Sequence, residues 1–151
     1  MGKVSFSYAD RTLRIGYKTA VKAAVESLFK KEKVVLDHLS YVFCSDDYLL
    51  TINSSFLQHN TYTDIITFNL SEKAAPGITG EIYISLDRVK DNSIRFSSGF
   101  RDELLRVVFH GALHLCGYKD KKPADIALMR KKEAEYIALF YKNNKALLSS
   151  R

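Results

Sequence analysis

This chain of 151 residues has few prolines, glycines and cysteines and no long apolar run, and these absences exclude several classes of protein. Two prolines and seven glycines leave no linker-like or low-complexity stretch that would divide the chain. No apolar run approaches the roughly 20 residues that a membrane span needs, and the start lacks the pattern of a signal peptide. The two cysteines have no disulfide-framework spacing. We therefore expect one domain, residues 1–151, in the cytoplasm and with no membrane partner.

Positive charge is in excess, with a formal net charge of +6, and the excess gathers near the C-terminus. From residue 121 onward, three acidic residues stand against eight basic ones: Lys121, Lys122, Arg130, Lys131, Lys132, Lys142, Lys145 and Arg151. A basic surface attracts polyanions such as nucleic acid or anionic lipid. The alternative is a solvated helix face, and charge alone does not decide between the two.

The spacing of apolar residues indicates the fold class. Helices are expected at residues 18–33, 46–56, 87–96, 100–116 and 123–144, and strands at 4–8, 39–44, 63–70 and 80–86. Helices interleaved with about four strands predict an α/β (α+β) domain in which a mixed sheet packs against helices.

The expected helix 100–116 carries two histidines, His110 and His114, on an otherwise apolar segment. A helix that is apolar nearly all round is buried. Residues four apart lie on the same helix face, so both imidazoles can reach one point. This pair is typical of the metal-binding helix of zincins.

The residues after the histidines complete a ligand pattern. Gly117 allows the chain to turn left-handed and fold back, so that Asp120 can add an oxygen ligand. Three protein ligands and one free position are typical of catalytic zinc, and we expect one zinc ion per chain. The alternative is two core histidines followed by an ordinary helix end. Cys116 lies on the opposite side of the helix and is interpreted as a small core residue.

One absence in the motif bears on the reaction. Metalloproteases of this pattern carry glutamate directly after the first histidine as general base, whereas this chain has Gly111. The metal must then ionise its water largely unaided, or a base must come from elsewhere. A metalloprotease is therefore disfavoured.

Three stretches together resemble one family. Residues 110–118 match the motif H-G-x-L-H-L-x-G-Y, residues 53–56 and 63–68 resemble N-x-x-Y and T-D-V-L-S-F, and residues 80–85 resemble G-D-I-x-I-S. With these motifs the sequence resembles the YbeY family of metal-dependent endoribonucleases.

The resemblance implies a single-strand-directed, metal-dependent endoribonuclease that uses zinc-bound water. Its implied partners are ribosomal RNA and the ribosome, in ribosomal RNA maturation and ribosome quality control. Asp120 stands where the family usually has a third histidine, and aspartate is also a competent zinc ligand. The basic C-terminal face would hold the RNA backbone.

A second departure concerns an arginine that the resemblance assigns to handling the RNA phosphate, because this chain has Leu57 there. His59 or Arg106 are the alternative positive groups, and Asp64 either lines the cleft or caps a turn. Leu57 also supports a different function, a non-hydrolytic ribosome-assembly factor with a structural metal site.

Overall fold

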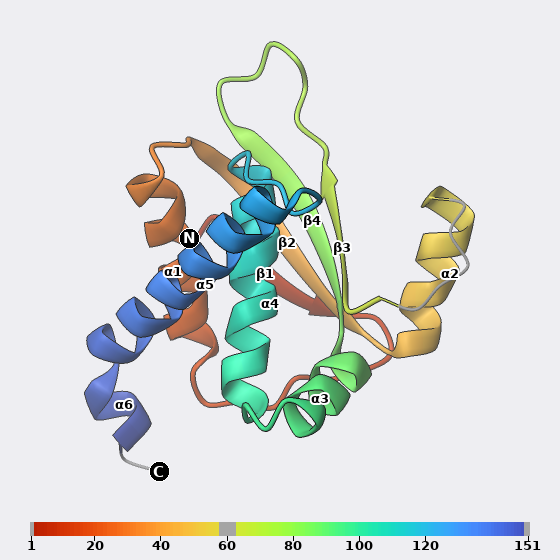
Figure 1. Ribbon diagram of the computed structural model, residues 1–151. Coiled ribbons are helices and arrows are strands. Elements are labelled where there is room, and N and C mark those ends of the chain that lie inside the picture. Colours follow the sequence, from red (N-terminus) through yellow and green to blue (C-terminus); the bar gives the residue numbers. More distant parts are fainter. Residues whose placement is uncertain (1, 58–62, 150–151) are drawn as a thin grey trace.

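A four-stranded mixed sheet forms the centre of the protein in the computed structural model, which describes residues 2–57 and 63–149 (Figure 1). The strands are β1 (Val4–Tyr8), β2 (Leu36–Cys44), β3 (Ile65–Asn69) and β4 (Ile78–Ser85). Their order in the sheet is β1-β2-β4-β3. The pairs β1–β2 and β2–β4 are parallel, whereas β3 is antiparallel to β4. This sheet with its helices confirms the fold class predicted from the sequence.

Helices follow the predicted order with small shifts at their ends. They are α1 (Lys18–Lys31), α2 (Asp46–Leu57), α3 (Leu86–Arg95), α4 (Phe100–Leu115), α5 (Pro123–Asn143) and α6 (Lys145–Ser149). The short α6 was not predicted, and β2 begins three residues earlier than expected. The early start of β2 has a tertiary cause, because Leu36 pairs with Ile78 on the distant strand β4. None of the helices within the described ranges is long and apolar enough to cross a membrane.

The two faces of the sheet carry different clusters, as the two-residue period of a strand requires. Ile82 and Ile84 of β4 belong to the large core that the sheet forms with α1, α4 and α5. Tyr83, which lies between them in sequence, packs on the other face with Ile66 and with Leu49 of α2. Helices therefore pack against both faces, and α4 is the helix that passes through the main core.

Gly111 shows how closely α4 lies against the sheet. A Cβ atom at this position would lie 2.8 Å from Cδ1 of Ile82 and 2.9 Å from Cδ1 of Ile65. Both atoms are the ends of isoleucine side chains, so a larger residue at position 111 would require these side chains to move. Residue 111 thus faces the sheet, and glycine allows α4 to approach it closely.

Candidate metal centre

The end of α4 forms a turn that reverses the chain. Gly117 has φ of 106°, in the left-handed region that favours glycine. Its N–H donates to the carbonyl of His114 at 3.0 Å, and the N–H of Tyr118 donates to the carbonyl of Leu113 at 3.0 Å. These two bonds define a Schellman motif. The turn carries Asp120 back toward the exposed ends of the two histidines, as the spacing predicts.

Three side chains meet at this turn. Oδ2 of Asp120 lies 3.1 Å from Nε2 of His110 and 3.4 Å from Nε2 of His114. One ligand atom from each residue lies within 4.8 Å of the others. Nitrogen and oxygen ligands around tetrahedral zinc are separated by about 3.4 Å, given metal–ligand distances of about 2.0–2.2 Å. The residues present therefore fit a divalent ion of this size.

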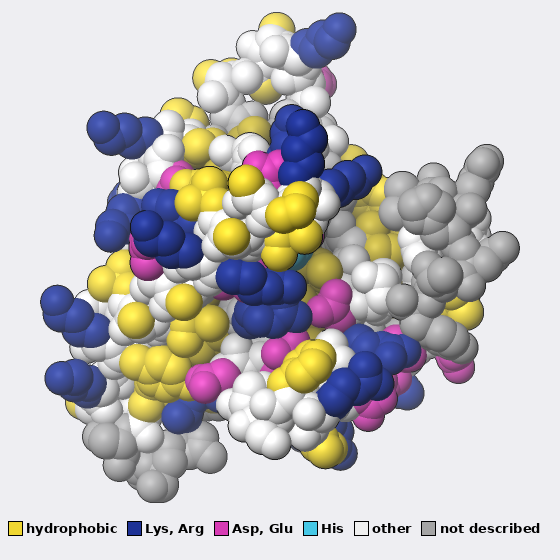
Figure 2. All heavy atoms as spheres, in the orientation of Figure 1, with side chains coloured by type: hydrophobic (Ala, Val, Ile, Leu, Met, Phe, Trp, Pro, Cys, Tyr) yellow, Lys and Arg dark blue, Asp and Glu magenta, His cyan; other side chains and the backbone are white. Residues whose placement is uncertain are grey.

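The site is buried on one side and open on the other. His110 is buried, whereas the side chains of His114 and Asp120 are 30% and 37% exposed. Figure 2 shows a small area of histidine at the surface, directly beside a group of Lys and Arg side chains. A substrate can thus approach a bound metal from the side of His114 and Asp120.

Hydrogen bonds fix which ring nitrogen of each histidine faces the metal position. Nδ1 of His114 lies 2.9 Å from the carbonyl oxygen of Tyr118, which can only accept a hydrogen bond. Nδ1 of His110 lies 2.6 Å from Oε2 of Glu133. An ionised carboxylate also only accepts, so both Nδ1 atoms carry the proton. Both Nε2 atoms are then left with lone pairs to bind a metal.

Glu133, which was not predicted from the sequence, is the hydrogen-bond partner of His110. Burial opposes its ionisation, but hydrogen bonds from His110 and Arg130 hold the pKa of the Glu133 carboxyl below its usual value. The residue lies 23 positions after His110 on a different helix. A signal was present in the sequence, because Glu133 interrupts the buried stripe that Met129, Tyr136 and Phe140 form on α5. A lone acid on such a stripe calls for a buried partner.

Glu32 anchors the loop that follows α4. Its carboxylate accepts hydrogen bonds from the hydroxyl groups of Tyr118, at 2.7 Å, and Tyr136. The ammonium of Lys132 lies 3.6 Å away. Burial opposes the ionisation of Glu32, but these partners lower its pKa. Because the backbone carbonyl of Tyr118 orients His114, Glu32 connects α1 and α5 to the metal centre.

Arg106, one of the two alternative positive groups, is paired with carboxylates beside the centre, and its Nε and Nη2 atoms donate hydrogen bonds to them. Its guanidinium donates from Nη2 to Glu103 at 2.7 Å and to Asp64 at 3.1 Å. Asp64 therefore pairs with α4. The other alternative, His59, lies outside the described residues. Leu57 is the last residue of α2, and its side chain also lies outside the description.

Cys116, which the sequence predicts to be a small core residue, is not one of the three residues that meet at the centre. Its side chain packs against the main core as the sequence predicts. Burial raises the pKa of its thiol to about 12, so sulfur stays protonated at neutral pH.

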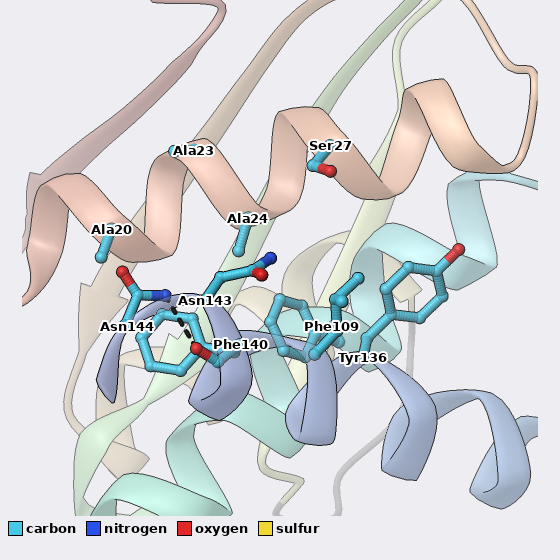
Figure 3. Close-up of a pocket in the computed structure, with 10 residues that line it drawn as sticks. Ala20, Ala23, Ala24, Ser27, Phe109, Tyr136, Phe140, Asn143 and Asn144 are labelled. Carbon is cyan, nitrogen blue, oxygen red and sulfur yellow. Dashed lines mark hydrogen bonds between the residues drawn. The ribbon is translucent and has the colours of Figure 1, made fainter. Parts of the chain in front are cut away.

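A separate pocket of about 230 Å³ lies between α1 and α5 (Figure 3). Its walls include Ala20, Ala24, Phe109 and Phe140, with two asparagines at one end. No histidine, cysteine or acidic residue lines the described part of this pocket. Its described part therefore lacks the side chains that hold zinc in proteins, unlike the candidate centre on α4.

Comparisons with known proteins identify the family of this chain. Residues 5–141 match the family described as Endoribonuclease YbeY. Proteins of that name from Cytophaga hutchinsonii and Flavobacterium psychrophilum are each 44% identical to this chain, over 90% and 91% of it and 94% and 96% of their own lengths. The solution structure of a Thermotoga maritima protein superposes with a TM-score of 0.67 at 28% identity, covering 98% of this chain and 95% of that one. The chain therefore belongs to the YbeY endoribonuclease family.

Proposed function

We propose that this protein is an endoribonuclease that cleaves single-stranded RNA with one zinc ion held by His110, His114 and Asp120. The observation that carries the proposal is the convergence of three ligand atoms within 4.8 Å. Two imidazole ligands favour zinc over harder cations such as magnesium. Membership of the family supports ribosomal RNA as substrate, and we place the activity in ribosomal RNA maturation and ribosome quality control in the cytoplasm.

The residues of the site have separate tasks in this reaction. When bound, zinc supplies a Lewis acid and lowers the pKa of the water that it binds. His110 and His114 present Nε2 to the ion, and Glu133 and the Tyr118 carbonyl keep the proton on Nδ1. Asp120 supplies the third ligand and, with His114, faces the side from which RNA approaches.

Two alternative functions fit the geometry less well. A metalloprotease would need glutamate at position 111, where this chain has a glycine packed against isoleucine side chains of the sheet. A ribosome-assembly factor with a structural metal would need a closed site, because structural zinc sites have four protein ligands. Here three residues converge, and two of them stay partly exposed.

The proposal is tested by cleavage of a short single-stranded RNA with purified protein. Metal content is measured on the same sample by elemental analysis, before and after treatment with a chelator. We expect about one zinc per chain, cleavage that stops when zinc is removed, and recovery when zinc is returned. A duplex of the same sequence is the control for strand specificity. Cleavage at full rate by metal-free protein would contradict the proposal.

A further inference from the structure

Two arginines lie beside the metal centre, and their guanidinium groups differ in how many carboxylates they contact. Arg106 donates from Nε and Nη2 to Glu103, at 3.1 and 2.7 Å, and from Nη2 to Asp64. Its Nη1 lies 3.9 Å from Oε1 of Glu133. Only 25% of the Arg106 side chain is exposed. Three carboxylates thus neutralise Arg106, which leaves it little attraction for a further anion.

Arg130, on the first half of α5, is held by one carboxylate and is otherwise open to solvent. Its Nη1 donates to both oxygens of Glu133, at 2.9 and 3.0 Å. Its side chain is 56% exposed. Within residues 2–57 and 63–149, Arg130 makes no other hydrogen bond, so the N–H groups of Nε and Nη2 remain available. A guanidinium with free donors on one side can bind a phosphate through two of them.

Glu133 links this guanidinium to the metal centre. The same oxygen, Oε2, accepts from Arg130 and from Nδ1 of His110. Only these two hydrogen bonds and one imidazole ring separate the guanidinium from Nε2, the atom that faces the metal position. The bond to Glu133 also restricts the arginine side chain before any substrate binds, which reduces the entropy lost on binding. The group of basic side chains beside the exposed histidine is visible in Figure 2.

We propose that Arg130 binds a backbone phosphate of the RNA next to the metal centre. This inference rests on the proposed function, because it assigns a substrate contact to the same site. Arg106 has a different task, which is to hold Asp64, Glu103 and Glu133 together beneath the centre. Because Arg130 touches phosphate and not a base, its contribution is the same for every RNA sequence.

The test compares Arg130→Ala and Arg130→Lys with Arg95→Ala, a control that removes the same charge. Arg95 is exposed at the end of α3, a few residues before the start of α4. The two histidines lie near the opposite end of α4. KM, kcat and metal content are measured for each zinc-loaded variant on the same single-stranded RNA. The dependence of kcat/KM on salt concentration is measured as well.

For Arg130→Ala we expect kcat/KM to fall by about tenfold or more, the loss typical of a hydrogen bond between charged groups. The zinc content should stay at the wild-type value. The salt dependence of kcat/KM should weaken by the amount expected for the loss of about one phosphate contact. Arg130→Lys should keep the salt dependence but recover only part of kcat/KM, because lysine lacks the planar fork.

Two results would overturn the inference while leaving the proposed function intact. One is a kcat/KM for Arg130→Ala equal to that of Arg95→Ala. The other is a loss of zinc in Arg130→Ala that accounts for the whole loss of activity, since Arg130 would then act only by orienting Glu133. If the zinc-loaded wild type cleaves no RNA, the proposed function itself is wrong and the inference falls with it.

Discussion

Two clusters of polar and charged residues in this protein differ in what their polar atoms contact. The first is the metal centre at the end of α4. The second, here called the strand-end cluster, lies where the parallel strands β1, β2 and β4 end, and consists of Asp10, Arg11, Ser45, Asp46, Ser85, Asp87 and Arg88. Open sheets with parallel strands commonly bind ligands at this edge, so the strand-end cluster is where a ligand would be sought first.

The contacts of the strand-end cluster assign it a structural task. Both oxygens of Asp10 accept from Ser45, at 2.7 and 2.6 Å. Asp46 pairs with Arg88 at 2.6 Å, and Asp87 accepts from Arg11 and from the backbone N–H of Asp46. Each carboxylate is thus satisfied by donors of the protein.

The same cluster caps two helices. The hydroxyl of Ser45 accepts from the N–H of Tyr48 in α2, and that of Ser85 from the N–H of Arg88 in α3. At the metal centre, by contrast, three acceptor atoms face one another and leave lone pairs directed at one point. Unsatisfied lone pairs, and not the number of charges, distinguish a binding site from a structural cluster.

The largest expected effect is the loss of metal from the centre when a histidine is removed. His110→Ala and His114→Ala should each lose stoichiometric zinc, because one of three protein ligands is gone. RNA cleavage should fall by more than the roughly 100-fold that loss of a partner behind a ligand can cost. Elemental analysis and a cleavage assay measure the two effects. Full zinc content in both variants would show that the histidine nitrogen atoms do not bind the ion. The metal centre would then not differ from the strand-end cluster in the way described.

A second prediction concerns the carboxylate ligand. Asp120→Ala should weaken zinc binding, whereas Asp120→His should retain zinc because imidazole is an equally competent ligand. Titration with zinc against a competing chelator measures both affinities. Native zinc affinity in Asp120→Ala would show that residue 120 does not contact the ion, and the centre would be reduced to two histidines.

Replacing Glu133 tests whether the residue behind His110 matters to the centre. Glu133→Gln keeps the size of the side chain but removes its charge, so it should lower zinc affinity by about tenfold, near the small end of such effects. The same chelator competition measures it. Glu135→Gln, two residues further along on the exposed side of α5, is the matched control and should leave the affinity unchanged. Equal affinities for wild type and Glu133→Gln would mean that His110 is oriented by packing alone.

The lowered pKa of Glu133 also predicts how stability depends on pH. A carboxyl whose pKa is lower in the folded than in the unfolded state stabilises the fold at pH values above the unfolded pKa, near 4.5. That stabilisation is lost as the pH falls through the folded pKa. Metal-free wild type should therefore melt at a higher temperature than Glu133→Gln at pH 7, and the difference should shrink below pH 4. A difference that stays constant over this range would contradict the assignment.

The smallest effect is expected in the strand-end cluster. Asp46→Asn should lower the free energy of unfolding by about 1 kcal/mol or less, because the ion pair with Arg88 is partly exposed. Zinc content and the rate of RNA cleavage should not change. Urea unfolding measures the first quantity, and the assays already described measure the others. A loss of cleavage without a loss of stability would show that the strand-end cluster takes part in the reaction.

Local patterns in the sequence were sufficient to predict that His110, His114 and Asp120 lie close together. His110, His114, Gly117 and Asp120 lie within eleven consecutive residues, and the geometry of one helix and one turn brings them together. Helical and strand periods also predicted the four strands and the order of the main helices. These features depend on spacing between near neighbours in the chain, which the sequence displays directly.

Other features depend on contacts between distant segments. Glu133 reaches His110 because α5 packs against α4, and Arg106 is neutralised because β3 brings Asp64 beside it. The basic C-terminal face is also uneven, since Lys132 is paired with Glu32, directly after α1, whereas Arg130 keeps free donors. Spacing predicts which groups one helix presents to a metal, because the helix is regular. Which cation remains free for RNA depends on the acids that packing brings beside it, and those acids come from the end of α1, from α4 and α5, and from the segment that leads into β3.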